Sequence, residues 1–280
     1  MSIYINDVAV TEFDDLVHAT FQAKGFKLDG AVRTRRGVVG KDTQFSIIRP
    51  GLAQQKALQD DVTPMNVQYN KVLANLRNWV APEYSDIFGQ REVNFDEISE
   101  LSQVIHKAIG RRADQEVLDA LEASATSKVI LDGGAGFTYE KFLEAYENLD
   151  EDAVDTEDRY LLIPARAATQ LLQEQEFISS DFVRNQVLNR PTALDGQEIL
   201  GFKIKVIPNM TEGGLPKTGD IVTCYAFQKN AVGLAVGMDF STEVNYVPVK
   251  TSFLATGKYR AGAVAIDDLG IVKVNIDITK

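Results

Sequence analysis

Residues 94–122 read NFDEISELSQVIHKAIGRRADQEVLDALE and carry the strongest structural signal in the chain. Asn94 is a favourable helix N-cap, and Glu97, three residues later, completes a capping box. Apolar residues then recur at steps of three and four, which is the period of one face of an α-helix. An unbroken helix from Phe95 to Glu122 would be about 40 Å long, and Gly110 in its middle is expected to bend it. We therefore predict a long scaffold helix whose core face consists of Ile98, Leu101, Ile105, Ile109, Leu118 and Leu121.

Upstream of this helix, residues 32–48 read VRTRRGVVGKDTQFSII and concentrate positive charge. Two short strand-like runs flank a glycine-rich turn, a pattern that indicates a hairpin. Its cations are Arg33, Arg35, Arg36 and Lys41. We predict that this basic hairpin protrudes from the body of the protein.

The chain then continues as a longer excursion. Phe45 and Ile47 alternate with polar residues, as in a half-buried strand, and Pro50 begins a turn. Strand spacing returns over residues 67–73. Residues 30–79 are therefore expected to form a two-stranded arm. An isolated hairpin is only marginally stable in water, so this arm needs a surface to lie against.

The rest of the sequence mixes helical and strand patterns, which predicts an α+β fold. A short helix is expected near residues 11–25, with an apolar stripe and Gly25 as its stop. Further helices are predicted at 139–149, 165–177 and 181–188, and an exposed acidic link at 150–159. A buried strand is predicted at 160–165, and several more strands follow between residues 195 and 277. The stripe of the first helix consists of Phe13, Leu16, Val17 and Phe21.

Composition excludes several classes of protein. The 280 residues carry a formal net charge of -11, which favours solubility and argues against a surface that binds nucleic acid throughout. The sequence has no apolar run of the roughly 18 residues needed to span a bilayer, so no membrane partner is expected. Its first residues lack a signal-peptide pattern. The single cysteine, Cys224, excludes an intramolecular disulfide and suits a reducing cytoplasm.

Residues suited to catalysis are scarce. The two histidines, His18 and His106, lie in predicted helices and are expected to be surface or packing residues, and Cys224 is expected in the core. The stretch LDGGAG at 131–136 follows a β-branched run and precedes a helix, as a phosphate loop does, but it lacks GxGxxG spacing and a lysine. GVVGKD at 37–42 resembles the end of a Walker A loop without its serine or threonine. We predict that both are turns, and we expect no catalytic, cofactor-binding or metal-binding residue.

The basic stretch therefore needs another explanation. Single-stranded nucleic acid is normally bound by cations interleaved with aromatic residues, and none lies between Val32 and Lys41. A solvated loop without a partner remains one interpretation. The other is contact with a second copy of the chain, in which opposite charges set partner and register. The acidic link at 150–159 would be a suitable surface.

The order of these elements resembles that of the major capsid proteins of tailed bacteriophages, which have the Hong Kong 97-type (Johnson) fold. The resemblance rests on residues 81–121, which read APEYSDIFGQREVNFDEISELSQVIHKAIGRRADQEVLDAL, and on four later stretches. These are RYLLIPARAATQLLQ at 159–173, DGQEILGFKIKVIPNM at 195–210, YAFQKNAVGLAV at 225–236 and KYRAGAVAIDDLGIVKVNID at 258–277. It covers most of the chain from about residue 23 onward.

The resemblance implies a division of the chain into four regions. They are an N-terminal arm (1–29), an extended loop (30–79), a peripheral domain containing the spine helix (80–159 and 245–280), and an axial domain (160–244). The extended loop would reach over an adjacent subunit. The implied contact residues of this loop are Arg33, Arg35, Arg36, Lys41 and Arg49.

The resemblance also implies the function. The protein would be a major capsid protein that assembles through pentamers and hexamers into an icosahedral head, enclosing double-stranded DNA without reading its sequence. It would assemble in the host cytoplasm and reside in the virion. A portal, a decoration protein and a separate scaffolding protein are implied partners, the last because the chain starts close to its arm. The alternative is an encapsulin-type compartment of the same fold, against which the excursion at 30–79 argues. A third interpretation, a nucleotide-dependent enzyme, would use LDGGAG.

Overall fold

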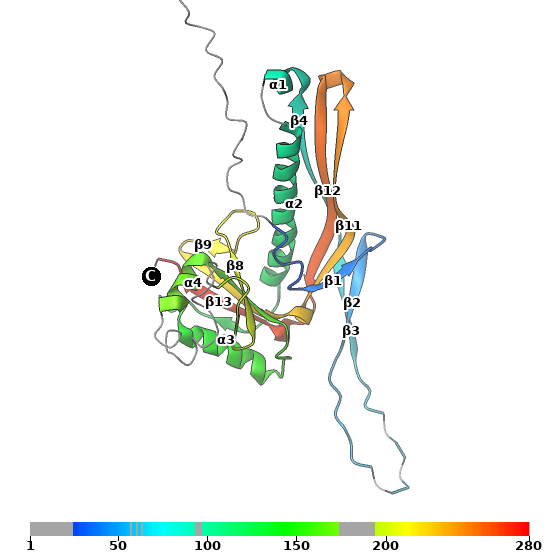
Figure 1. The fold of residues 1–280 in the computed structure, drawn as a ribbon. Coiled ribbons are helices and arrows are strands. Elements are labelled where there is room, and N and C mark those ends of the chain that lie inside the picture. The colour runs from blue at the N-terminus through cyan, green and yellow to red at the C-terminus, as the bar shows by residue number, and fades with distance from the viewer. Residues whose placement is uncertain are drawn as a thin grey trace, which may run out of the picture.

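The computed structural model describes residues 25–56, 58–59, 61–62, 64–92, 97–173 and 194–279. The helices expected near 11–25 and at 181–188, together with His18 and the cap residue Asn94, lie outside the described residues. Within the described residues, one long helix and an elongated sheet form one part of the molecule, and a second sheet with two helices forms the other (Figure 1).

The long helix α2 runs from Glu97 to Glu122, which confirms the predicted scaffold helix. Ile105, Ile109, Leu118 and Leu121 are buried, whereas Ile98 and Leu101 are half-buried. The helix lies along one elongated four-stranded sheet (Figure 1). That sheet has the order β1-β11-β12-β4, with β1 at Arg33–Arg36, β11 at Val232–Val247, β12 at Ser252–Ala265 and β4 at Arg77–Asp86. The short helix α1, Ile87–Glu92, follows β4.

Gly110 has a role that its position in the sequence did not suggest. The chain at Gly25 and Phe26 crosses α2 at this residue, and the Phe26 N–H donates to the Gly110 carbonyl at 3.2 Å. A Cβ on Gly110 would lie 3.1 Å from the Gly25 Cα, and one on Gly25 would lie 2.2 Å from the Gly110 carbonyl carbon. Two glycines therefore allow two backbone segments to touch.

The second sheet has seven strands in the order β5-β13-β10-β6-β8-β7, with β9 paired to β10. Helix α3, Tyr139–Glu151, packs on β13 and β5, and α4, Ala165–Gln173, packs on β6 and β8. Every residue of β6 is buried, as predicted for that stretch. The strands are β5 at Val129–Ile130, β6 at Arg159–Pro164, β7 at Glu198–Ile199, β8 at Phe202–Ile207, β9 at Lys217–Thr218, β10 at Ile221–Gln228 and β13 at Ile271–Asp277. Short 3-10 helices lie at Lys229–Ala231 (η2), Pro248–Lys250 (η3) and Asp268–Gly270 (η4).

A separate two-stranded hairpin leaves the body of the molecule (Figure 1). Its strands are β2, Asp42–Ile48, and β3, Tyr69–Asn75, which pair in antiparallel register from Asp42–Asn75 to Ile48–Tyr69. The predicted long excursion is therefore present. The prediction that residues 32–48 form a hairpin of their own is wrong, because β1 pairs in parallel with β11 and not with β2.

The sheets cut across the region boundaries implied by the resemblance. The strand β13, within 245–280, pairs with β10, within 160–244, in the seven-stranded sheet. Likewise β11, which extends across residue 244, pairs with β12 along most of its length. Each sheet therefore contains strands from both sides of the expected boundary at residue 245.

Candidate assembly interface

The five expected contact cations do not lie together on a protruding loop. Arg33, Arg35 and Arg36 belong to the edge strand β1, in parallel register with residues 233–236 of β11. Lys41 stands just before β2, and Arg49 just after it. The sequence placed the three arginines beyond the body, whereas pairing with a strand distant in the sequence holds them against it.

Arg36 forms ion pairs within its own chain. Its guanidinium lies 2.5 Å from a carboxylate oxygen of Asp29 and also pairs with Asp239 of β11. The negative charge of these carboxylates, above all that of Asp29, raises the pKa of Arg36 above its usual value. Arg33 and Arg35 remain exposed, and the Arg33 guanidinium lies 5.9 Å from the centre of the Phe45 ring. Arg36 therefore stabilises the fold, while Arg33 and Arg35 present charge outward.

The base of the hairpin is packed against the body. Phe45 of β2 and Ala74 of β3 are buried together with Val38, Ala235 and Ile266 in a small apolar cluster. Glycines in the long strands make this approach possible, since a Cβ on Gly262 would lie 1.9 Å from the Asn75 carbonyl oxygen. The base of the hairpin is thus a fixed part of the subunit.

The distal part of the hairpin is exposed and carries apolar side chains. Leu52, Leu58, Val62 and Met65 are 85%, 100%, 76% and 56% exposed. Four large apolar side chains left exposed along one projecting segment make it a candidate for a surface that a partner covers. Sequence reasoning missed these residues because it followed the cations. The signal was present as isolated apolar residues in an otherwise polar stretch at 51–68.

A groove of about 720 Å³ lies at the base of the hairpin. Arg33, Arg49 and the end of β2 line one side, and Asp152 and Asp155 of the acidic link line another. Two of the cations predicted to meet a second copy, Arg33 and Arg49, therefore share a groove with the acidic link of their own chain. Arg49 also lies 3.9 Å from Asp267, which is a loose ion pair.

Much of the acidic link is neutralised within the subunit. Asp150 pairs at 2.7 Å with Arg159, whose side chain is fully buried, and Asp152 pairs at 2.5 Å with Lys128. Asp158 pairs with Lys203. These ion pairs hold the link, which follows α3, against the seven-stranded sheet. Its negative charge is less available to a partner than the sequence suggested.

The glycine loop at 131–136 is built for a cation and not for a phosphate. The ammonium group of the buried residue Lys141 donates to the carbonyl oxygens of Asp132, Ala135 and Gly136 at 2.7, 3.0 and 3.0 Å. A phosphate loop would turn N–H groups inward instead. Burial lowers the pKa of Lys141. The loop is a turn, as predicted, and Lys141 occupies its concave side.

Cys224 and His106, which were also considered for catalysis, are packing residues. Cys224 is fully buried, and its burial raises the pKa of the thiol. His106 packs its ring 4.7 Å from Phe240 and 5.5 Å from Phe26. No group of three or more metal-binding side chains occurs among the described residues.

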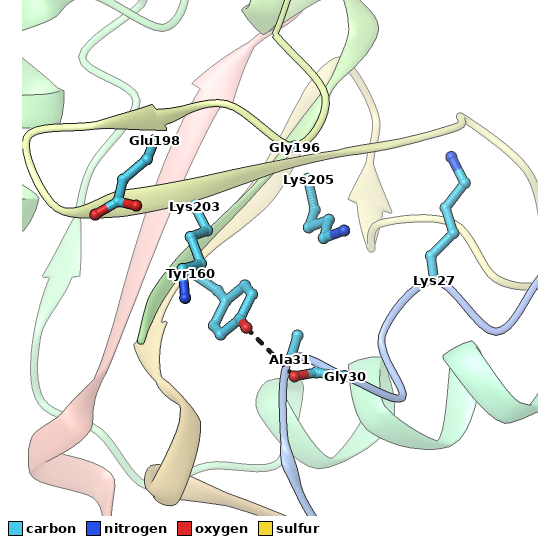
Figure 2. Close-up of a pocket in the computed structure, with 8 residues that line it drawn as sticks. All are labelled: Lys27, Gly30, Ala31, Tyr160, Gly196, Glu198, Lys203 and Lys205. Atoms are coloured by element: carbon cyan, nitrogen blue, oxygen red, sulfur yellow. Dashed lines mark hydrogen bonds between the residues drawn. The ribbon is translucent and has the colours of Figure 1, made fainter. Parts of the chain in front are cut away.

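A smaller pocket of about 230 Å³ lies between the segment before β1 and the seven-stranded sheet (Figure 2). Lys27, Lys203 and Lys205 surround it, and the Tyr160 hydroxyl points to the Gly30 carbonyl at 3.3 Å. Lys27 donates to the Val206 carbonyl at 3.0 Å, and Lys203 pairs with Asp158. Two of the three ammonium groups thus have partners in the chain, and the contacts attach residues 27–31 to the sheet.

Comparison with known proteins agrees with this architecture. The family model described as phage capsid protein matches residues 5–278. The capsid of cyanophage P-SCSP1u has a TM-score of 0.72 and 17% identity, with 96% of this chain and 93% of that chain covered. For Mycobacterium phage Che8 the TM-score is 0.73 at 14% identity, with 98% of each chain covered. For the head of Helicobacter pylori bacteriophage KHP40 it is 0.77 at 11% identity, with 99% and 100% covered. No curated protein matches.

These matches favour a phage capsid over the encapsulin-type compartment and over an enzyme. The solved neighbours are shells of phages and of gene transfer agent particles, which supports self-assembly and a place in the virion. Helices long and apolar enough to cross a membrane do not occur in the described part of the chain. Since the family model covers nearly all 280 residues, the chain belongs to the phage capsid protein family and is a structural, major capsid protein with the Hong Kong 97-type fold.

Proposed function

We propose that the β2–β3 hairpin is the extended loop through which each subunit grips an adjacent copy. The observation that carries this proposal is the exposed apolar set on its distal part: Leu52, Leu58, Val62 and Met65. A two-stranded hairpin with such residues gains stability only when another surface covers them. The packed base holds the hairpin in position to reach that surface.

Repetition of this contact builds rings, because the hairpin and the surface that receives it are different parts of the subunit. Such heterologous contacts close into rings when the rotation between subunits allows it. Pentamers and hexamers of this kind form the icosahedral head and enclose double-stranded DNA without reading its sequence. The net charge of -11 suits a wall that does not hold the packaged DNA. The remaining partners in this proposal are a separate scaffolding protein, a portal and, in shells that carry one, a decoration protein.

The contact cations are retained in this proposal with one exception. Arg33, Arg35, Lys41 and Arg49 steer the approach of a neighbouring copy, because their positive charge stands out in an acidic molecule. Arg36 is engaged by Asp29 and Asp239 and acts within the subunit.

We also propose the four regions with boundaries drawn by sheet. The N-terminal arm keeps residues 1–29, and the extended loop is the hairpin from β2 to β3. The peripheral domain consists of α2 and the four-stranded sheet. The axial domain consists of α3, α4 and the seven-stranded sheet, including β13.

The test replaces the apolar contact without changing the fold. Leu52→Asp combined with Leu58→Asp adds two charges at exposed positions of the hairpin. We expect soluble, folded subunits that fail to form shells, measured by sedimentation and electron microscopy.

The matched control is Gln54→Asp combined with Gln55→Asp, which adds the same charge at exposed positions between them. Shells should form in the control, because no apolar side chain is lost. Normal shells from the leucine variant would contradict the proposal, as would equal failure of both variants.

A further inference from the structure

A groove of about 570 Å³ lies between α2 and the strand β11. It is lined by Ser99, Ser102, Gln103, His106, Lys107 and, from β11, Phe240. We call it the helix groove. Phe240 and His106 are only half-buried there, so part of an aromatic surface is exposed.

The helix groove ends where the described chain begins. The Phe26 ring lies 5.5 Å from the ring of His106 and 6.4 Å from that of Phe240, so Phe26 contacts two of the residues that line the groove. Gly25 touches α2 at Gly110, one turn beyond His106. The residues that precede Gly25 therefore leave the described structure at the end of this groove.

The sequence upstream has the pattern of an occupant. Phe13, Leu16, Val17 and Phe21 form a stripe at helical spacing, and such a stripe needs a partner surface. In a helix, Phe13 to Phe21 would span about 12 Å, which equals the span from Ser99 to Lys107 along α2.

We propose that residues 12–21 dock as a helix in the helix groove of their own chain. The stripe covers Phe240 and His106, and the polar face of the segment, which includes Asp15, remains in solvent. The segment of the same chain is the occupant because Phe26 already holds its end at the groove. This arrangement makes the N-terminal arm part of the support of the scaffold helix.

The test uses cysteine pairs and a short bis-maleimide crosslinker on the full-length protein. Native Cys224 is fully buried and does not interfere. Val17→Cys combined with Gln103→Cys places one thiol on the stripe and one on the groove. The control, Asp15→Cys with Gln103→Cys, places the first thiol on the opposite face of the predicted helix.

Docking predicts a crosslink within one chain for the Val17 pair, identified by peptide mass spectrometry, and its loss in the Asp15 control. Thermal melting of both variants checks that they fold alike. Absence of a crosslink, or equal crosslinking in the two variants, would overturn the proposal. Crosslinked dimers from a mixture of chains carrying Val17→Cys alone and Gln103→Cys alone would also overturn it, because the segment would then dock on a second copy.

Discussion

Asp114 holds a buried charge at the point where the chain crosses the scaffold helix. Its side chain is 4% exposed, and its two oxygens accept the backbone N–H groups of Lys27 and Leu28 at 3.2 and 3.0 Å. Burial raises the pKa of Asp114 from 3.8 to about 6, against the opposing effect of these hydrogen bonds and of the Lys27 ammonium. Asp29 adds a like charge and raises the pKa further.

This raised pKa predicts a specific dependence of stability on pH. Between about pH 4 and 6 the folded chain binds the Asp114 proton more readily than the unfolded chain, so stability falls as pH rises. A shift of this size corresponds to roughly 3 kcal/mol. Asp114→Asn removes the charge and should flatten this part of the profile, measured by urea unfolding of unassembled subunits from pH 4 to 7. Identical pH slopes for the two proteins would exclude this role.

A second prediction at the level of a single residue concerns Gly110. Alanine is favoured over glycine in a helix by about 1 kcal/mol, so Gly110→Ala would stabilise an isolated helix. Here the new methyl group would lie 2.8 Å from the Phe26 ring and 3.1 Å from the Gly25 Cα. We expect a net loss of about 1–3 kcal/mol in the free energy of unfolding, measured by denaturant titration.

A matched substitution separates crowding from helix propensity. Gly89 lies in α1, and a Cβ there would have its nearest neighbour at 3.9 Å. Gly89→Ala should therefore be neutral or slightly stabilising. If both alanine variants gain stability, the close crossing at Gly110 is not a constraint.

Among the elements, those with a strong local pattern could be predicted from sequence. The scaffold helix α2 shows three- and four-residue spacing throughout, and β6 shows a continuous apolar run between an acidic link and a helix. The turn after β1 was also recognisable from its two glycines. In the structure Gly37 and Gly40 both have positive φ, at 70° and 110°. Periodicity and turn chemistry are local properties, so the sequence carries them directly.

Strand pairing could not be predicted in the same way. The arginine strand β1 lies next to β2 in sequence, and a turn between two strands normally indicates a hairpin. Its actual partner is β11, beginning at Arg33 opposite Gly233, and no local pattern encodes a pairing at that distance. The consequence for the candidate interface is direct. The arginines were placed on the projecting element, whereas they lie in an edge strand of the body and the hairpin that projects carries exposed apolar residues.

A prediction at the scale of an element concerns cleavage of the hairpin by a protease. Lys56 is exposed on its distal part and offers a cleavage site for trypsin. Free subunits should be cut after Lys56 early in digestion, while assembled shells should resist, because the proposed contact would place the hairpin under a neighbouring copy. Peptide mass spectrometry over time measures this difference, and Lys56→Gln is the control that removes the site. Equal cleavage rates in subunits and shells would show that the hairpin is not covered.

At the scale of the whole molecule, the net charge opposes assembly. Each subunit carries a formal net charge of -11, so copies repel one another at low ionic strength. Salt screens this repulsion, since the Debye length falls from about 30 Å at 0.01 M to about 8 Å at 0.15 M. If the exposed cations of β1 contribute to contact between copies, as proposed, their effect should be largest when screening is weak.

Two neighbouring arginines allow the electrostatics of assembly to be separated from those of folding. Arg35 is exposed and forms no ion pair within the described part of the chain, whereas Arg36 bridges Asp29 and Asp239. Arg35→Glu should slow shell formation at low salt, with the defect shrinking as salt rises, and should leave subunit unfolding unchanged. Arg36→Glu should instead lower the free energy of unfolding, by about 1 kcal/mol given the exposure of this pair. Light scattering follows assembly, and urea titration follows folding. If Arg35→Glu assembles like the wild type at every salt concentration, β1 contributes nothing to recognition between copies, and the exposed apolar residues of the hairpin remain as the source of the contact.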